Sequence, residues 1–250
     1  MTTEFDQESQ SLIDSLFHIP LPLSWENTED LKGVASGWTA TAKKIKDNHR
    51  YYPGCIVKWY TPHTPSPDQK RFFAQNAVAL QRLTPLGLRI GLGRIPHLRA
   101  SGRFMDQPAV IETPVQHMFG NTFHEQFHSA TPENRLMFYT SLANLKAVLA
   151  FGGVVHAEAD QRDFACSPTF SAGVVDFGQS WTIGSPLNDG TRTEAEKNAT
   201  IHLAQWMRET ERNSRSPLDI EPLYDRSLTT FSSRSLTTFS SLYRALGRIK

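Results

Sequence analysis

The sequence predicts an α+β fold in two lobes, with a small β-rich N-terminal lobe and a short, mostly helical C-terminal lobe. β-branched and aromatic residues at 55–60 are typical of a strand, and short apolar runs broken by Gly and Pro follow at 85–114. Apolar residues recur with helical spacing at 135–151 and again at 193–211. Pro114 lies between the two patterns and marks the expected lobe boundary.

These patterns divide the chain of 250 residues into an N-terminal helical extension at 1–30, the N-terminal lobe at 31–113, the short C-terminal lobe at 114–222 and a Ser/Thr-rich tail at 223–250. In the tail, the octad that begins at Arg226 is repeated without change at 234–241. One repeat is too short for a solenoid unit, so we expect the tail to be flexible.

The N-terminal half contains two expected helices and one strong expected strand. Residues 4–17 have the apolar spacing of a short amphipathic helix, and residues 68–83 that of a longer one. The strand at 55–60 follows a basic, polar stretch at 43–53 that suits a hairpin loop. A further hairpin is expected near 101–102, where Ser precedes Gly.

The C-terminal half alternates long helices with short apolar runs. Pro132 and Glu133 favour a helix start just before 135–151, and the glycine pair at 152–153 favours its end. Two short apolar runs follow, at 154–155 and 173–175, each of them followed by polar residues, and the second run is strand-like.

Composition excludes some function classes. The net charge is +1, from 26 basic and 25 acidic residues, so we expect no nucleic-acid partner. No run of about 18 apolar residues and no signal peptide is visible, so we expect no membrane partner and a cytoplasmic or nuclear location. Cys55 and Cys166 lack metal-type spacing and are expected to be free, buried thiols.

The sequence Asp-Phe-Gly at 176–178 follows an apolar run, which is the context of a metal-binding carboxylate at the end of a strand. Asp176 would bind Mg²⁺, and Gly178 would permit a tight backbone turn. Phosphoryl transfer also needs a lysine on the phosphates and a group that orients the nucleophile. Protein kinases supply these groups in a fixed order along the chain, against which this sequence can be compared.

The expected catalytic loop begins at His156, after a long helix and a Val-Val run. Glu158 stands where the kinase pattern has its catalytic Asp, and Asp163 stands where the pattern has its metal-binding Asn. Glu158 keeps a carboxylate on a side chain that is one methylene longer, and a misplacement of about 1 Å can cost on the order of a hundredfold in rate. Asp163 still offers oxygen ligands to Mg²⁺.

Lys58, in the strand at 55–60, takes the place of the strand lysine that holds phosphates. The helix that follows should supply a glutamate partner for this lysine, but Asn76 and Ala77 occupy the aligned positions. The sequence therefore predicts that the lysine–glutamate pair is lost. Gly33 and Gly37 form a reduced glycine loop ahead of the strand, with two glycines instead of three.

These elements occur in order between about residue 31 and residue 180, and the chain resembles fungal-type protein-kinase-like proteins. The resemblance implies a two-lobed nucleotide cleft with ATP and Mg²⁺ as cofactors, and a hinge at 111–114 that includes Glu112. It implies an ATP-dependent phosphotransferase or, because of the altered loop, a pseudokinase that acts as a scaffold for a protein partner. The implied site comprises catalytic Glu158, His156 and Asp163, the nucleotide-binding Gly33, Gly37, Lys58, Glu112 and Asp176, and Asp163 and Asp176 at the metal.

A competing motif, His-Glu-x-x-His at 124–128, raises a third possibility. On one helix face, His124 and His128 can bind zinc, with Glu125 as general base. Zinc catalysis needs a third protein ligand, and none of the candidates has a persuasive spacing; they are His97, His117, His156 and Glu133. A zinc-dependent hydrolase is therefore the second alternative.

Overall fold

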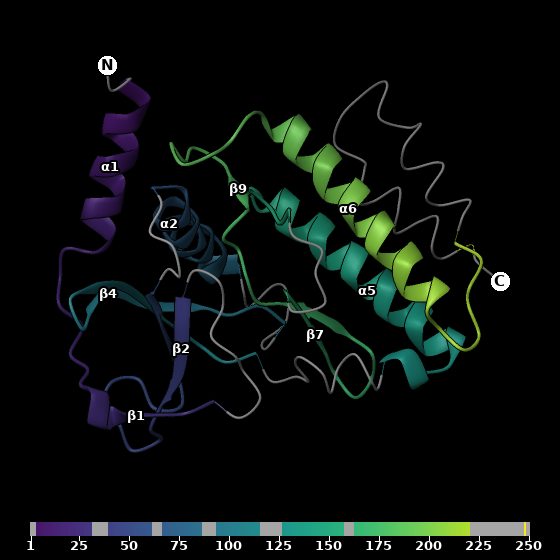
Figure 1. The fold of residues 1–250 in the computed structure, drawn as a ribbon, viewed down its shortest axis with the longest axis horizontal. Helices are drawn as coiled ribbons and strands as arrows, with labels where there is room; N and C mark the ends of the chain where they lie inside the picture. The colour runs from purple at the N-terminus through teal and green to yellow at the C-terminus, as the bar shows by residue number, and fades with distance from the viewer. Residues whose placement is uncertain are drawn as a thin grey trace.

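The computed structural model describes residues 4–31, 40–61, 67–86, 94–115, 127–157 and 163–220, and Arg248. It has a mixed α+β architecture, which confirms the expected fold class at that level: a five-stranded antiparallel sheet lies on one side and a pair of long helices on the other (Figure 1). The duplicated octad of the tail lies outside the described residues. No helix among the described residues is both long and apolar enough to cross a membrane.

The sheet is antiparallel throughout, with the strand order β1-β2-β3-β5-β4. Its strands are β1 (Thr28–Glu29), β2 (Ala40–Ile45), β3 (Ile56–Tyr60), β4 (Leu98–Phe104) and β5 (Gln107–Glu112). The predicted strand at 55–60 is confirmed as β3. The loop predicted at 43–53 is shorter than expected, because Lys43 and Lys44 belong to β2.

Successive side chains along each strand point to opposite faces of the sheet, and the two faces have different contacts. Val57, Trp59 and Ile111 pack on one face. Tyr60 and Val110 point to the other face, where they contact α1 (Glu4–Leu16) and α2 (Pro67–Leu83), the two helices predicted for this half. Lys58 and Glu112 share the parity of Tyr60 and Val110, so both lie on the face that α2 covers.

The hairpin between β4 and β5 turns at Met105 and Asp106. Their φ angles of 52° and 60° are both left-handed, as a two-residue type I′ turn requires. The prediction of a turn near 101–102 was wrong, because Ser101 and Gly102 pair with β5 inside strand β4. Met is an unusual residue for this turn, so the pattern of Gly and Pro did not indicate it.

The N-terminal segment after α1 runs along β4. The Arg103 amide donates to the Ile19 carbonyl, and the Leu21 amide donates to the Arg103 carbonyl, each at 2.8 Å. At the crossing, a Cβ on Gly102 would lie 2.3 Å from the Ile19 carbonyl oxygen, so only glycine permits this approach.

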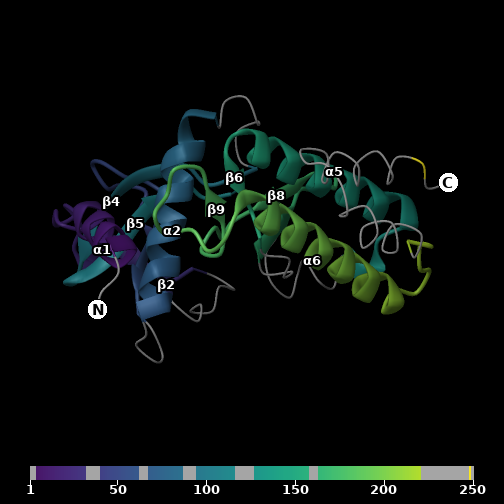
Figure 2. The same ribbon diagram turned by 90° about the horizontal axis from the view of Figure 1, so that it is seen from above.

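The helical part is built on α5 (Pro132–Phe151) and α6 (Arg192–Arg212), which lie side by side in both views (Figures 1 and 2). Both helices were predicted, and both begin after a threonine cap, Thr131 or Thr191, whose side chain accepts a backbone N–H. Two short strand pairs complete this part: β6 (Val154–Val155) with β9 (Trp181–Thr182), and β7 (Phe164–Cys166) with β8 (Ala172–Val174).

A buried ion pair joins the two long helices. Arg135 Nε and Nη2 donate to the two carboxylate oxygens of Glu211 at 2.9 and 3.0 Å. The Tyr139 hydroxyl donates to the same carboxylate at 2.7 Å, and the Leu218 amide at 2.8 Å. Both charged side chains are almost fully buried, and the four donors satisfy the carboxylate.

Helix α2 lies between the sheet and the α5–α6 pair (Figures 1 and 2). Phe73 and Ala77 pack with the sheet, whereas Leu80 and Leu83 belong to the core around α5 and α6. Polar contacts add to this link, because Gln75 Nε2 donates to Thr182 Oγ1 at 3.0 Å. The helix is thus part of two hydrophobic cores.

Candidate functional site

Lys58 and Glu112 form an ion pair across neighbouring strands. Lys58 lies opposite Val110 in the β3–β5 ladder, so Glu112, two residues further along, is its diagonal neighbour on the same face. Lys58 Nζ is 2.6 Å from Glu112 Oε1. The carboxylate side chain is only 4% exposed and the lysine side chain 21% exposed. The lysine side chain is therefore the more exposed partner of the pair.

The lysine also reaches the Asp-Phe-Gly segment, which is 117 positions away in the sequence. Lys58 Nζ donates to the carbonyl oxygen of Val175 at 3.3 Å. Val175 directly precedes Asp176, so the two motifs that the sequence singled out lie together.

The Asp-Phe-Gly segment makes a tight turn that α2 helps to hold. Asp176 Oδ1 accepts a hydrogen bond from the Gly178 amide at 2.9 Å, and the Phe177 amide donates to Asn76 Oδ1 at 3.1 Å. A Cβ on Gly178 would lie 3.3 Å from Asp176 Oδ1, a tight contact that glycine avoids. Phe177 is fully buried, whereas Asp176 is half-buried. The turn therefore anchors the ring and leaves the carboxylate partly accessible.

His156 supports this turn from inside the core. Its Nε2 is hydrogen-bonded to the Asp176 carbonyl oxygen, so Nε2 must carry a proton. Lys146 Nζ donates to His156 Nδ1 at 2.9 Å and to the His156 carbonyl at 3.0 Å. His156 and Lys146 are both 0% exposed. The structure thus places His156 behind the turn, as a group that holds the Asp176 backbone.

Asp163 lies next to the Asp176 turn through backbone pairing. Its carbonyl accepts a hydrogen bond from the Val175 amide at 3.0 Å, and its side chain is half-buried. The other predicted site residues Glu158, Gly33 and Gly37 lie outside the described residues. The structure therefore brings together Lys58, Glu112, His156, Asp163 and Asp176.

Opposing influences act on the Glu112 carboxyl. Burial raises its pKa above the ordinary value, the Lys58 ammonium lowers it, and the negative charge of Asp176 raises it further. The Asn76 side chain also lowers the pKa. Glu112 Oε2 is buried without a hydrogen bond of ordinary geometry. This carboxyl is therefore held in place chiefly through Oε1 and Lys58.

Sequence reasoning missed this role of Glu112. The prediction that Lys58 lost its glutamate partner was wrong in that Lys58 has one, supplied by a strand instead of by α2. At the expected hinge, the Thr113 amide is already bonded to the His97 carbonyl at 3.0 Å. Val110 and Glu112 are two positions apart, which places them on the same face of a strand. That Glu112 lies beside Lys58 follows only once the β3–β5 register is known.

Among the described residues, no group of three or more His, Cys, Asp or Glu side chains lies close enough together to hold a metal ion. Of the His-Glu-x-x-His motif only its last histidine, His128, falls within these ranges, in a short helical turn at 127–129. His124, Glu125 and the third-ligand candidate His117 lie outside the described residues.

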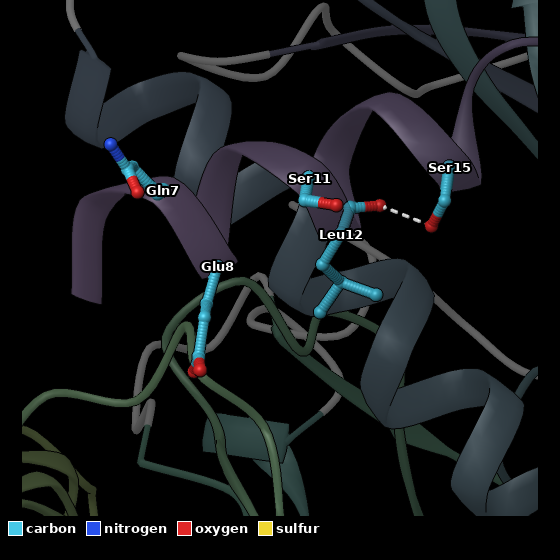
Figure 3. Close-up of a pocket in the computed structure, with 5 residues that line it drawn as sticks. All are labelled: Gln7, Glu8, Ser11, Leu12 and Ser15. Carbon is cyan, nitrogen blue, oxygen red and sulfur yellow. Dashed lines mark hydrogen bonds between the residues drawn. The ribbon is translucent and has the colours of Figure 1, made fainter. Parts of the chain in front are cut away.

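A surface hollow of about 470 Å³ lies against α1 (Figure 3). Its lining comes from one helix and comprises Gln7, Glu8, Ser11, Leu12 and Ser15. The hollow is open, and the Ser15 hydroxyl donates to the Leu12 carbonyl of its own helix at 2.8 Å. It contains none of the predicted site residues.

Comparisons with known proteins do not identify the chain. No model of a known protein family matches it, and no curated protein matches it.

Proposed function

We propose that this chain is a protein-kinase-like nucleotide-binding protein with weak or absent phosphotransfer. The contact between Lys58 Nζ and the Val175 carbonyl carries the proposal, because it places a strand lysine beside the Asp176 turn. In phosphoryl transfer, the lysine holds phosphates and the aspartate holds the metal that bridges them. Lys58 and the residue before Asp176 are thus in contact although they are far apart in the sequence, which supports the proposal.

In this proposal ATP and Mg²⁺ are the ligands. Lys58 would contact phosphate oxygens, and Asp163 and Asp176 would bind Mg²⁺, since carboxylate oxygens are the ligands that this hard cation prefers. Bound Mg²⁺ would neutralise charge on the phosphates. Glu158 would be the base, and Gly33 and Gly37 would cover the phosphates. Cys55 and Cys166, two free and buried thiols, support a cytoplasmic or nuclear setting.

The alternative is a non-catalytic pseudokinase that binds a protein partner. It is favoured by Glu158 and Asp163, which replace the Asp and Asn of the kinase pattern. Lys58 is also engaged by Glu112 and by the Val175 carbonyl, so nucleotide must compete for its ammonium donors.

A fluorescent ATP analogue with Mg²⁺ tests nucleotide binding. We expect saturable binding by the wild-type chain and an affinity about tenfold or more lower for Lys58→Met, because a hydrogen-bonded charge is removed. Lys197→Met is the matched control, since Lys197 is exposed on α6. Equal affinity of the two variants would contradict the assignment of Lys58, and no binding by the wild type would contradict the proposal.

A transfer assay with radiolabelled ATP separates a weak enzyme from a scaffold. Turnover that is abolished by Glu158→Gln, with nucleotide affinity unchanged, supports the phosphotransferase. Nucleotide binding without turnover supports the pseudokinase. A chain that binds one zinc ion, lost on His128→Ala, would instead favour the zinc hydrolase.

A further inference from the structure

The position of Asn76 shows how the site manages without a helix glutamate. Asn76 lies on α2, is 4% exposed and accepts the Phe177 amide, so this helix position faces the Asp176 turn. The neighbouring candidate position, Ala77, is packed in the core. An amide thus occupies the helix position that faces the turn, and the nearby carboxylate comes from Glu112.

We propose that Glu112 is the positioning residue of Lys58, and that it takes over from strand β5 the role that a helix glutamate has in the kinase pattern. The proposal rests on the function proposed above and deepens it. Glu112 acts through Lys58: its carboxylate fixes the ammonium at 2.6 Å, and the Val175 carbonyl fixes it from the other side at 3.3 Å.

The unequal exposure of the two side chains supports this role. The Glu112 side chain is 4% exposed, whereas the Lys58 side chain that it contacts is 21% exposed. Replacement of a buried ion pair by apolar residues of similar volume is often neutral or stabilising, so such a pair is weak evidence for a role in stability. A role in ligand binding would account for a pair that holds a partly exposed lysine side chain beside the Asp176 turn.

The source of the carboxylate has a regulatory consequence. In kinases, movement of the glutamate-bearing helix makes and breaks the pair. Here both partners lie on hydrogen-bonded neighbouring strands, β3 and β5. A shift of α2 would not separate the two strands that carry the pair, although it would move the Asp176 turn, whose Phe177 amide is bonded to Asn76.

Amine labelling tests the pair without any nucleotide. An ammonium held in an ion pair with a carboxylate is less available to an acylating reagent, so we expect about tenfold faster labelling of Lys58 in Glu112→Gln at pH 8. Labelling of the exposed Lys197 is the internal control, and circular dichroism checks folding. Glu112→Asp keeps the charge on a shorter side chain, serves if Glu112→Gln does not fold, and should give an intermediate rate.

A relocated carboxylate gives a second test. Asn76→Glu in the Glu112→Gln background restores one carboxylate on the helix side, so we expect slow Lys58 labelling and tight binding of the ATP analogue to return. The same Asn76→Glu change in the wild type adds a carboxylate near Glu112 and Asp176. We therefore expect a lower free energy of unfolding in that variant and no gain in affinity for the ATP analogue. Asn76→Glu is thus expected to restore affinity in the Glu112→Gln background and not to raise it in the wild type. General destabilisation would not produce this difference between the two backgrounds.

The outcomes separate the two proposals. Equal labelling of Lys58 in the wild type and Glu112→Gln would overturn the positioning role. Wild-type affinity for the ATP analogue in Glu112→Gln would overturn it as well. Faster labelling in a chain whose wild type binds no ATP analogue would support the pairing and overturn only the nucleotide assignment.

Discussion

At the scale of the residue, burial and charge act in opposite directions on Glu112. Burial disfavours its anion, and Asp176 adds to this effect, while Lys58 favours the anion. The net result is a pKa above the ordinary value of 4.5. Between pH 4.5 and the raised pKa, the folded chain therefore binds more protons at this site than the unfolded chain does.

The first prediction follows from the sign of this difference. As pH rises through that window, Glu112 loses a proton that the fold favours, so its contribution to the free energy of unfolding falls, by about 1.4 kcal/mol for each unit by which its pKa is raised. Urea denaturation of the wild type and of Glu112→Gln from pH 4 to pH 8 measures the effect. The stability of the wild type relative to the variant should fall with pH; a constant or rising difference would contradict the raised pKa.

Both ring nitrogens of His156 are engaged in hydrogen bonds. Because Nε2 faces the Asp176 carbonyl and Nδ1 accepts from Lys146, His156 should be a single Nε2–H tautomer. Nitrogen-15 chemical shifts of the ring distinguish the tautomers. The exposed His202 is the comparison and should show a mixture. A proton on both ring nitrogens of His156 at pH 7 would rule out the arrangement with Lys146.

At the scale of the element, α5 and α6 depend on polar as well as apolar contacts. The Arg135–Glu211 pair is buried within their interface, whereas the Arg192–Glu196 pair within α6 is partly exposed. Removal of one partner from a buried pair leaves the other charge without compensation, and that costs far more than loss of a pair near solvent.

We therefore expect Glu211→Gln to lower the free energy of unfolding by about 3–5 kcal/mol. Glu196→Gln, the matched change in the partly exposed pair, should cost under about 1 kcal/mol. Urea denaturation measures both. Similar costs for the two variants would show that burial does not decide the strength of these pairs.

The β4–β5 hairpin gives a prediction in the stabilising direction. Met105 and Asp106 adopt left-handed φ angles that Asn and Gly adopt at lower cost. Met105→Asn together with Asp106→Gly should raise the free energy of unfolding by about 1 kcal/mol, because left-handed backbone strain is relieved at both positions. Gln107→Gly, one position further and inside β5, should lower it. Thermal denaturation of the three chains checks both signs.

At the scale of the whole molecule, α2 makes the sheet and the helical part interdependent. It contributes Phe73 and Ala77 to one core, Leu80 and Leu83 to the other, and Gln75 to a polar contact with β9. Neither core can lose this helix without exposing apolar surface, so the two parts should unfold together.

Two tryptophans can report on the two parts, Trp59 in the sheet and Trp206 on α6. Variants that keep only Trp59 or only Trp206 of the five tryptophans in the chain should show the same urea midpoint, and Gln75→Ala should lower both midpoints equally. Separate midpoints would mean that the sheet and the helical part unfold independently.

The sequence could predict individual helices and strands, but not the contacts that depend on how the whole molecule is arranged. Local patterns were sufficient for β3 and the four long helices, because apolar spacing and caps such as Thr191 are read along the chain. That Lys58 and Asp176 belong to one site was implied only through the resemblance, and the Lys58–Glu112 pair was missed. Pairing depends on strand register and on how α2 is packed, and neither is encoded by neighbouring residues.

The crossing of the N-terminal segment over β4 bears on self-association. β4 is the last strand of the sheet order, and the unpaired groups of such a strand can pair with another chain. Ile19 and Leu21 occupy groups on that border at Arg103, and they approach closely because residue 102 is glycine. A valine at this position would push the segment away, so Gly102→Val should form dimers or larger aggregates at concentrations where the wild type does not.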